Sequence, residues 1–74
     1  MKEHHIDCKG LACPIPIMRI SQAMKTLTVG EVLEVEADDP AFPADIRAWA
    51  EMTGHEVVSL EEGRVMTARL RHCA

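Results

Sequence analysis

The spacing of apolar residues along the chain predicts two helices. The first opens at residues 13–16, where prolines suit a first turn, and runs to about residue 27. Its apolar stripe consists of Ile17, Ile20, Met24 and Leu27. The second follows a cap and a proline at residues 38–40 and ends before Gly54, with a stripe of Phe42, Ile46, Trp49, Ala50 and Thr53. Pro43 leaves the start of this helix open, because a proline in the fourth helical position lacks a needed N–H donor.

Alternating apolar and polar residues predict four strands, over residues 4–8, 31–38, 56–61 and 64–72. In the second strand, Leu33, Val35 and Ala37 point one way and the glutamates between them point the other way. The last strand alternates in the same manner, and Glu62-Gly63 joins it to the third strand as a hairpin. Because both alternating strands have a polar face, the sheet should carry helices on one side and face water on the other.

The resulting order, β-α-β-α-β-β, predicts the fold class. We expect a two-layer α/β (α+β) sandwich with a mixed four-stranded sheet and two helices on one face, formed by residues 1–74 as a single domain. The first two strands should be parallel, through a right-handed crossover. A domain of this size buries only about 60% of the surface of its unfolded chain, so any chemistry should lie near the surface. Met18, Met24, Met52 and Met66 are expected mostly to fill the core by position.

Composition and charge narrow the function classes. The chain carries 12 acidic and 8 basic residues, a net charge of −4, which argues against direct binding of nucleic acid. The nearest basic cluster, Arg64, Arg69 and Arg71, should be partly cancelled by neighbouring glutamates. No segment approaches the roughly 18 apolar residues of a membrane span, and no apolar run follows the first residues. We therefore expect no membrane partner and a cytoplasmic location.

The three cysteines, Cys8, Cys13 and Cys73, are an odd number, which speaks against a disulfide framework in a cytosolic chain. Metal, redox and nucleophilic roles stay open. No Cys-x-x-Cys or His-x-x-x-His spacing supports zinc, so neither a metal nor a cofactor is expected. Cys8 is expected to be a strand residue, with a role in resolving a persulfide as the alternative, and Cys73 to be a free thiol in the tail.

Cys13 is the candidate nucleophile, because it falls just before the first helix. The helix dipole there favours thiolate over thiol, which predicts the lowest pKa of the three cysteines. Pro14 and Pro16 should stiffen the loop and keep it extended, and Gly10 should let it turn sharply. Asp7 is expected to hydrogen-bond the loop in a structural role. The alternative is that Cys13 is a buried core residue and the prolines only start a helix.

The segment around Cys13 resembles the signature of the TusA family of sulfur carriers, also called SirA-like. The shared pattern is Asp7, Gly10-Leu11, Cys13-Pro14 and Pro16, in that order. Three downstream segments also resemble the family; these are Gly30-Glu31, Asp38-Asp39-Pro40 and Asp45-Ile46. The similarity covers about residues 5–72.

This resemblance implies a two-layer sandwich with an exposed cysteine at the start of its first helix, which is Cys13 here. That cysteine would accept sulfur from a cysteine desulfurase or a rhodanese-like donor and pass it on as a persulfide to a downstream protein, making the chain a sulfurtransferase of the carrier type. The carried sulfur would serve tRNA thiolation, cofactor assembly or sulfur oxidation. Two other hypotheses remain at this point: a non-catalytic regulatory module of the same fold, and a thiol redox protein that uses Cys8 and Cys13.

The first helix also predicts a surface for protein partners. At about 100° per residue, Ile15 and Met18 lie roughly 150° from the centre of the core stripe, on the side facing water. Two large apolar residues within one turn of Cys13 suggest a docking surface. The alternative is that the sheet edge or the Gly10 loop covers them.

Overall fold

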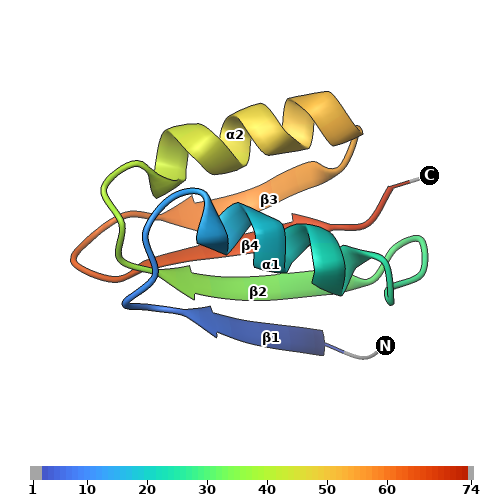
Figure 1. Ribbon diagram of the computed structural model, residues 1–74. Helices are drawn as coiled ribbons and strands as arrows, with labels where there is room; N and C mark the ends of the chain where they lie inside the picture. The colour runs from blue at the N-terminus through green and yellow to red at the C-terminus, as the bar shows by residue number, and fades with distance from the viewer. Residues whose placement is uncertain (1–2, 74) are drawn as a thin grey trace.

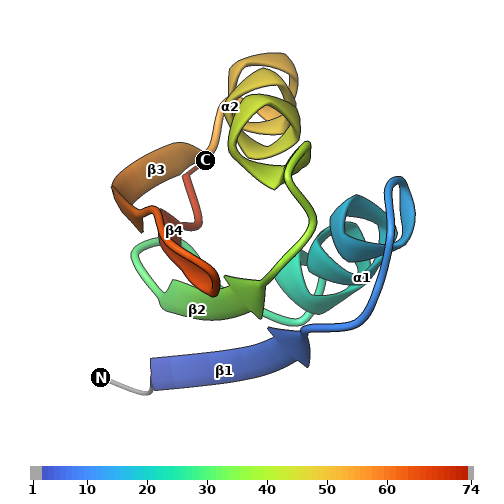
Figure 2. The same ribbon diagram turned by 90° about the vertical axis from the view of Figure 1, so that its left-hand side faces the viewer.

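The computed structural model describes residues 3–73 and contains the six predicted elements in the predicted order. They are β1 (Glu3–Cys8), α1 (Ile15–Met24), β2 (Val32–Ala37), α2 (Phe42–Thr53), β3 (Glu56–Glu61) and β4 (Met66–Arg71). Both helices lie on the same side of one sheet, as Figures 1 and 2 show. The predicted two-layer sandwich is therefore confirmed.

The sheet has the strand order β1-β2-β4-β3 and is mixed. β1 runs parallel to β2, with Ile6 opposite Val35, as the first crossover predicts. β4 pairs antiparallel with both β2 and β3, and the register against β3 shifts between Val57 and Ser59. Because β1 and β2 are parallel, their carboxyl ends, and the loops that follow them, lie at the same edge of the sheet (Figure 1).

The core lies between the sheet and the helices and follows the predicted pattern. Leu33, Val35 and Ala37 are fully buried from β2, while the glutamates between them are not. The helices contribute Ile20, Met24, Phe42, Ile46, Trp49 and Ala50 to the same core. Thr53, which the pattern placed in the core stripe of α2, is exposed because α2 ends there, followed by Gly54 in the left-handed conformation at φ 79°.

Both helices differ from the predicted bounds at one end. α1 ends at Met24 rather than near residue 27, because the chain turns there and the Thr26 hydroxyl donates to the Ala23 carbonyl at 2.8 Å. Leu27 is nevertheless buried, so the apolar spacing identified a core residue beyond the end of the helix. α2 begins at Phe42, which makes Pro43 the second helical residue, where a missing N–H donor is tolerated.

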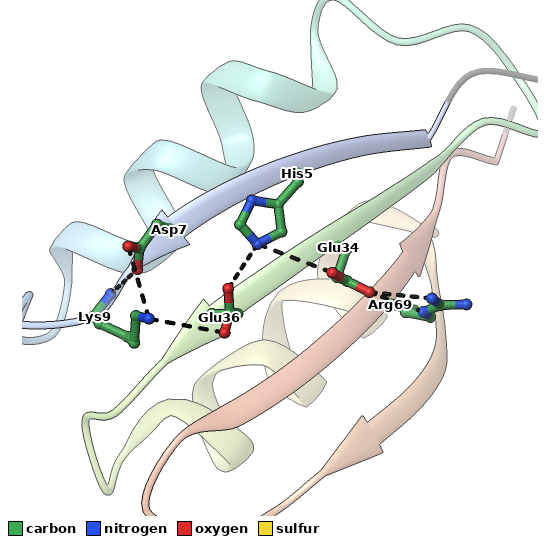
Figure 3. Close-up of polar contacts among 6 residues, drawn as sticks. All are labelled: His5, Asp7, Lys9, Glu34, Glu36 and Arg69. Carbon is green, nitrogen blue, oxygen red and sulfur yellow. Dashed lines mark hydrogen bonds and ion pairs between the residues drawn. The ribbon is translucent and has the colours of Figure 1, made fainter.

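The other face of the sheet is lined by charged side chains that pair across the strands (Figure 3). His5 Nε2 lies 2.8 Å from a Glu36 oxygen, and Arg69 donates to Glu34 at 3.1 Å. Glu34 thus pairs with one member of the predicted basic cluster, as the net charge suggested. Within residues 3–73, no helix is long and apolar enough to cross a membrane.

Candidate functional site

Cys13 lies in the loop between β1 and α1, at the sheet edge where β1 and β2 both end (Figure 1). Gly10 turns the chain with φ 81°, as expected, and Pro14 is the N-cap of α1. The loop is not extended as predicted. The Ile15 N–H donates to the Ala12 carbonyl at 2.9 Å, which closes a tight turn around an exposed Cys13. The Cys13–Pro14 peptide bond is cis.

Two aspartates from the loop after β2 hold this turn by its backbone. Asp38 accepts the Gly10 N–H at 3.0 Å, and Asp39 accepts the Cys13 N–H at 2.6 Å. The second oxygen of Asp39 accepts the Ala41 N–H at 3.1 Å, so one carboxylate ties the cysteine loop to the start of α2. In the sequence, this pair predicts a helix cap and matches the TusA pattern, but neither observation indicates a contact with the cysteine loop. The parallel pairing of β1 and β2 was the signal that could have placed it beside Cys13.

A third aspartate acts on the thiol. Asp45 lies in the first turn of α2, and hydrogen bonding to its carboxylate raises the pKa of the Cys13 thiol. Partial burial and the negative charges of Asp45 and Asp39 raise the pKa of Cys13 further. The predicted lowering of this pKa at the start of α1 is therefore wrong, because carboxylates from the neighbouring loop and helix raise it instead.

Cys13 opens into a groove of about 290 Å³ between the two helices. The groove is lined by Cys13, Pro14, Ile17, Asp45, Ala48, Trp49, Met52 and Thr53. Its walls are largely apolar, and Met52, which was expected in the core, is 87% exposed at its rim. Met18, which was also expected to fill the core, is exposed on α1, whereas Met24 and Met66 are buried as expected. The sulfur thus has an open approach between hydrophobic side chains.

The remaining residues singled out from the sequence are not among those that line this groove. Ile15 and Met18 are 40% and 54% exposed, which confirms that they face solvent rather than the core. Pro16 is buried in the first turn of α1. Asp7 accepts the Lys9 N–H at 2.9 Å, which is the structural contact with the loop that was predicted.

The other two cysteines occupy different environments. Cys8 is the last residue of β1, fully buried, and burial raises its pKa. It is the strand residue that the sequence predicted, with a side chain in the core rather than at the surface beside Cys13. Cys73 is half-buried beyond β4, and its N–H donates to His55 Nδ1 at 3.0 Å. Both thiols are free.

A second cavity, of about 260 Å³, shares Trp49 and Thr53 with the groove but does not include Cys13. The His55 ring stacks on Trp49 with 5.4 Å between ring centroids, and it lies 4.6 Å from the His72 ring, which is tilted by 52° against it. Burial lowers the pKa of His55, and the neighbouring His72 lowers it further. The neutral form of the His55 ring is therefore favoured.

Comparisons with known proteins agree on one family. The family described as "Sulfurtransferase TusA" matches residues 4–72. YrkF of Bacillus subtilis, named as a candidate sulfur carrier protein, is 49% identical over 67 residues; the match covers 89% of this chain but only 36% of YrkF. The sulfur carrier protein TusA of Allochromatium vinosum is 40% identical over 62 residues, covering 82% of each chain.

The fold has a counterpart among solved structures. A SirA-like protein from Desulfitobacterium hafniense superposes with a TM-score of 0.80 at 22% identity, covering 99% of this chain and 100% of its own. The family match over nearly all described residues, the two relatives and this shared fold lead to one conclusion: the chain belongs to the TusA family of sulfurtransferases.

Proposed function

We propose that the protein is a sulfur carrier in which Cys13 accepts a sulfur atom as a persulfide and relays it to a downstream protein. The observation that carries the proposal is the exposed Cys13 in a loop anchored by Asp39 and open to an apolar groove. The names of the relatives support it, since YrkF and the Allochromatium protein are named as sulfur carriers. A cysteine desulfurase or a rhodanese-like protein is the proposed donor.

In the loading step, the Cys13 thiolate attacks the terminal sulfur of a donor persulfide. A bond forms between Cys13 Sγ and that sulfur, while the bond between the two donor sulfurs breaks. The donor cysteine leaves as a thiolate and takes up a proton. In the unloading step, the acceptor thiolate attacks the terminal sulfur held by Cys13. A bond forms between the acceptor sulfur and that sulfur, while the bond to Cys13 Sγ breaks and Cys13 leaves as a thiolate. No external oxidant or reductant is needed, because every step exchanges one S–S bond for another.

The structural residues of the loop present the sulfur for this exchange. Asp39 fixes the backbone N–H of Cys13 at 2.6 Å, and Gly10 and the two prolines shape the turn. A fixed loop matters because the attacking sulfur must approach in line with the S–S bond that breaks. We further propose that Ile15 and Met18, exposed within one turn of Cys13, form the surface on which protein donors and acceptors dock.

The carrier assignment is tested by substituting the thiol. After incubation with a cysteine desulfurase and cysteine carrying radioactive sulfur, Cys13→Ser should retain no label, because the accepting thiol is gone. Cys73→Ser is the matched control and should retain as much label as the wild type. Circular dichroism and the melting temperature of Cys13→Ser should match the wild type, since Cys13 is exposed. Full labelling of Cys13→Ser contradicts the assignment.

The same incubation, followed by label counting and mass spectrometry, separates the other candidate functions. A regulatory module without carrier activity gives no label on the wild type, and a dithiol redox protein gives a mass loss of two hydrogens instead. The burial of Cys8 in the core disfavours the redox alternative, because a resolving thiol must reach the sulfur on Cys13.

A further inference from the structure

The carboxylate of Asp45 lines the same groove as the reactive sulfur. Asp38 and Asp39 are engaged by backbone N–H groups of the cysteine loop. By contrast, neither oxygen of Asp45 accepts a backbone N–H within residues 3–73, and Asp45 lines the groove together with Cys13. We propose that Asp45 is a positioning residue that keeps Cys13 and its carried sulfur slow to react with small thiols and electrophiles; this inference rests on the proposed carrier function.

The charges around Cys13 are one-sided. Asp39 approaches it from the loop after β2 and Asp45 from α2, and both carboxylates act on its sulfur. The nearest basic side chain in the loop, Lys9, is engaged with Asp7 at 4.0 Å and with Glu36 at 3.9 Å. In α1, Arg19 acts on the buried Cys8. No cation from residues 3–73 offsets the two carboxylates at Cys13.

Hydrogen bonding explains the direction of the effect. The neutral thiol can donate to the Asp45 carboxylate, whereas a thiolate at the same position has no proton to donate and is repelled by the negative charge. Asp45 therefore favours the protonated form of Cys13 and raises its pKa. Since the thiolate is the form that reacts, the free protein holds Cys13 in its less reactive form.

The same contact protects a sulfur that is already loaded. When a small thiolate attacks the terminal sulfur of the persulfide, a new S–S bond forms and the bond to Cys13 Sγ breaks. Cys13 then leaves as a thiolate and takes a proton from solvent. A leaving thiol with a raised pKa leaves more slowly, and the negative charge that develops on Sγ faces Asp45. Loss of the sulfur to small thiols is therefore slowed by the residue that faces it.

The experiment follows the pH dependence of alkylation at Cys13 with iodoacetamide, resolved by mass spectrometry of the peptide that contains it. Asp45→Asn removes the charge and keeps the shape of the side chain, so its alkylation midpoint should lie at lower pH and its rate at pH 7 should be several-fold higher. Asp45→Glu restores the carboxylate and should move the midpoint back toward the wild type. Glu51→Gln removes an exposed carboxylate from the same helix and serves as the matched control.

The outcomes are decisive for Asp45 whether or not sulfur is ever loaded. Equal midpoints for the wild type and Asp45→Asn, or an equal shift in Glu51→Gln, overturn the inference. The melting temperature of Asp45→Asn should stay near that of the wild type, which separates a local effect from unfolding. On loaded protein, Asp45→Asn should lose its sulfur to reduced glutathione several-fold faster; equal loss rates also overturn the inference. A wild type that never loads refutes the carrier function but leaves the alkylation result valid.

Discussion

At the scale of single residues, the three cysteines have the same chemistry and different surroundings. Cys13 is exposed in a loop, Cys8 is fully buried at the end of β1, and Cys73 is half-buried beyond β4. Reactivity of a thiol requires access as well as ionisation. These environments support the proposed exchange chemistry at Cys13 and place Cys8 in the core.

We predict that Cys8 and Cys73 are dispensable for sulfur transfer. The double variant Cys8→Ala, Cys73→Ala should pass sulfur to an acceptor at close to the wild-type rate, because neither thiol reaches the groove. Removing a buried side chain at Cys8 should lower stability, so transfer is measured well below the melting temperature of the variant. A tenfold slower transfer, about 1.4 kcal/mol on the barrier, would show that one of these thiols takes part.

The surroundings of Cys13 were only partly predictable at this scale. Its place before a helix follows from local sequence, because the prolines and the apolar stripe are neighbours in the chain. Its carboxylates come from far away: Asp39 is 26 positions from the N–H that it binds. The direction in which Asp45 points depends on how α2 is rotated against the sheet, which apolar spacing gives only coarsely. Local sequence therefore suggests an effect of the helix dipole on the pKa of Cys13, but it does not reveal the carboxylates that raise this pKa.

At the scale of an element, α1 has one face packed in the core and another face exposed to solvent. Ile20 and Met24 are buried against the sheet, whereas Ile15 and Met18 face solvent near Cys13. The helical period places these two pairs on opposite sides, and burial agrees with it. The end of α1 was predicted less accurately, because a hydrogen bond from a threonine hydroxyl, rather than a glycine or a proline, marks its last turn.

We predict that charge on the exposed face of α1 slows transfer without unfolding the domain. Ile15→Asp and Met18→Glu should keep the wild-type melting temperature and exchange normally with a small thiol, but exchange slowly with a protein donor. Ile20→Ala is the contrasting variant and should cost about 2 to 5 kcal/mol of stability, because Ile20 is fully buried. Normal transfer from a protein donor to both charged variants would place the docking surface elsewhere.

At the scale of the whole molecule, polar contacts tie the sheet and its loops together around the apolar core. Glu31, in the connection between α1 and β2, accepts the backbone N–H of Thr28 at 2.7 Å and lies 3.1 Å from His4 Nε2 on β1. The Thr28 backbone bond, followed by His4 and the Thr28 hydroxyl, lowers the pKa of Glu31 to about 2 from its ordinary 4.5. Because this pKa is lower in the folded than in the unfolded chain, the ionised carboxylate favours folding.

We predict that this contribution is present above about pH 4.5 and is lost as the pH falls toward about 2. The free energy of unfolding in urea, measured across this range, should therefore fall with pH in the wild type. Glu31→Gln should flatten that fall, because the group that titrates is gone. Glu51→Gln, an exposed glutamate on α2, should keep the wild-type slope. Identical slopes for Glu31→Gln and the wild type would contradict the assignment to Glu31.

The fold as a whole was predictable because each element carries its own period and the connections are short. Strand and helix alternation gave the parallel pairing of β1 and β2, and the glycine hairpin gave the pairing of β3 and β4. The groove was not predictable, since it depends on Met52 staying outside the core while its neighbour Trp49 enters it. Which side chains of α2 enter the core depends on how the helix is rotated about its own axis, because α2 is packed on only one side.

The central claim, that Cys13 carries the sulfur, is tested most directly on the wild-type protein. The protein is incubated with a cysteine desulfurase and cysteine, alkylated, digested, and each cysteine peptide is weighed by mass spectrometry. We expect the peptide that contains Cys13 to carry the mass of one additional sulfur atom, and the peptides that contain Cys8 and Cys73 to carry none. No added sulfur on the Cys13 peptide, or added sulfur on the Cys8 or Cys73 peptide instead, would contradict it.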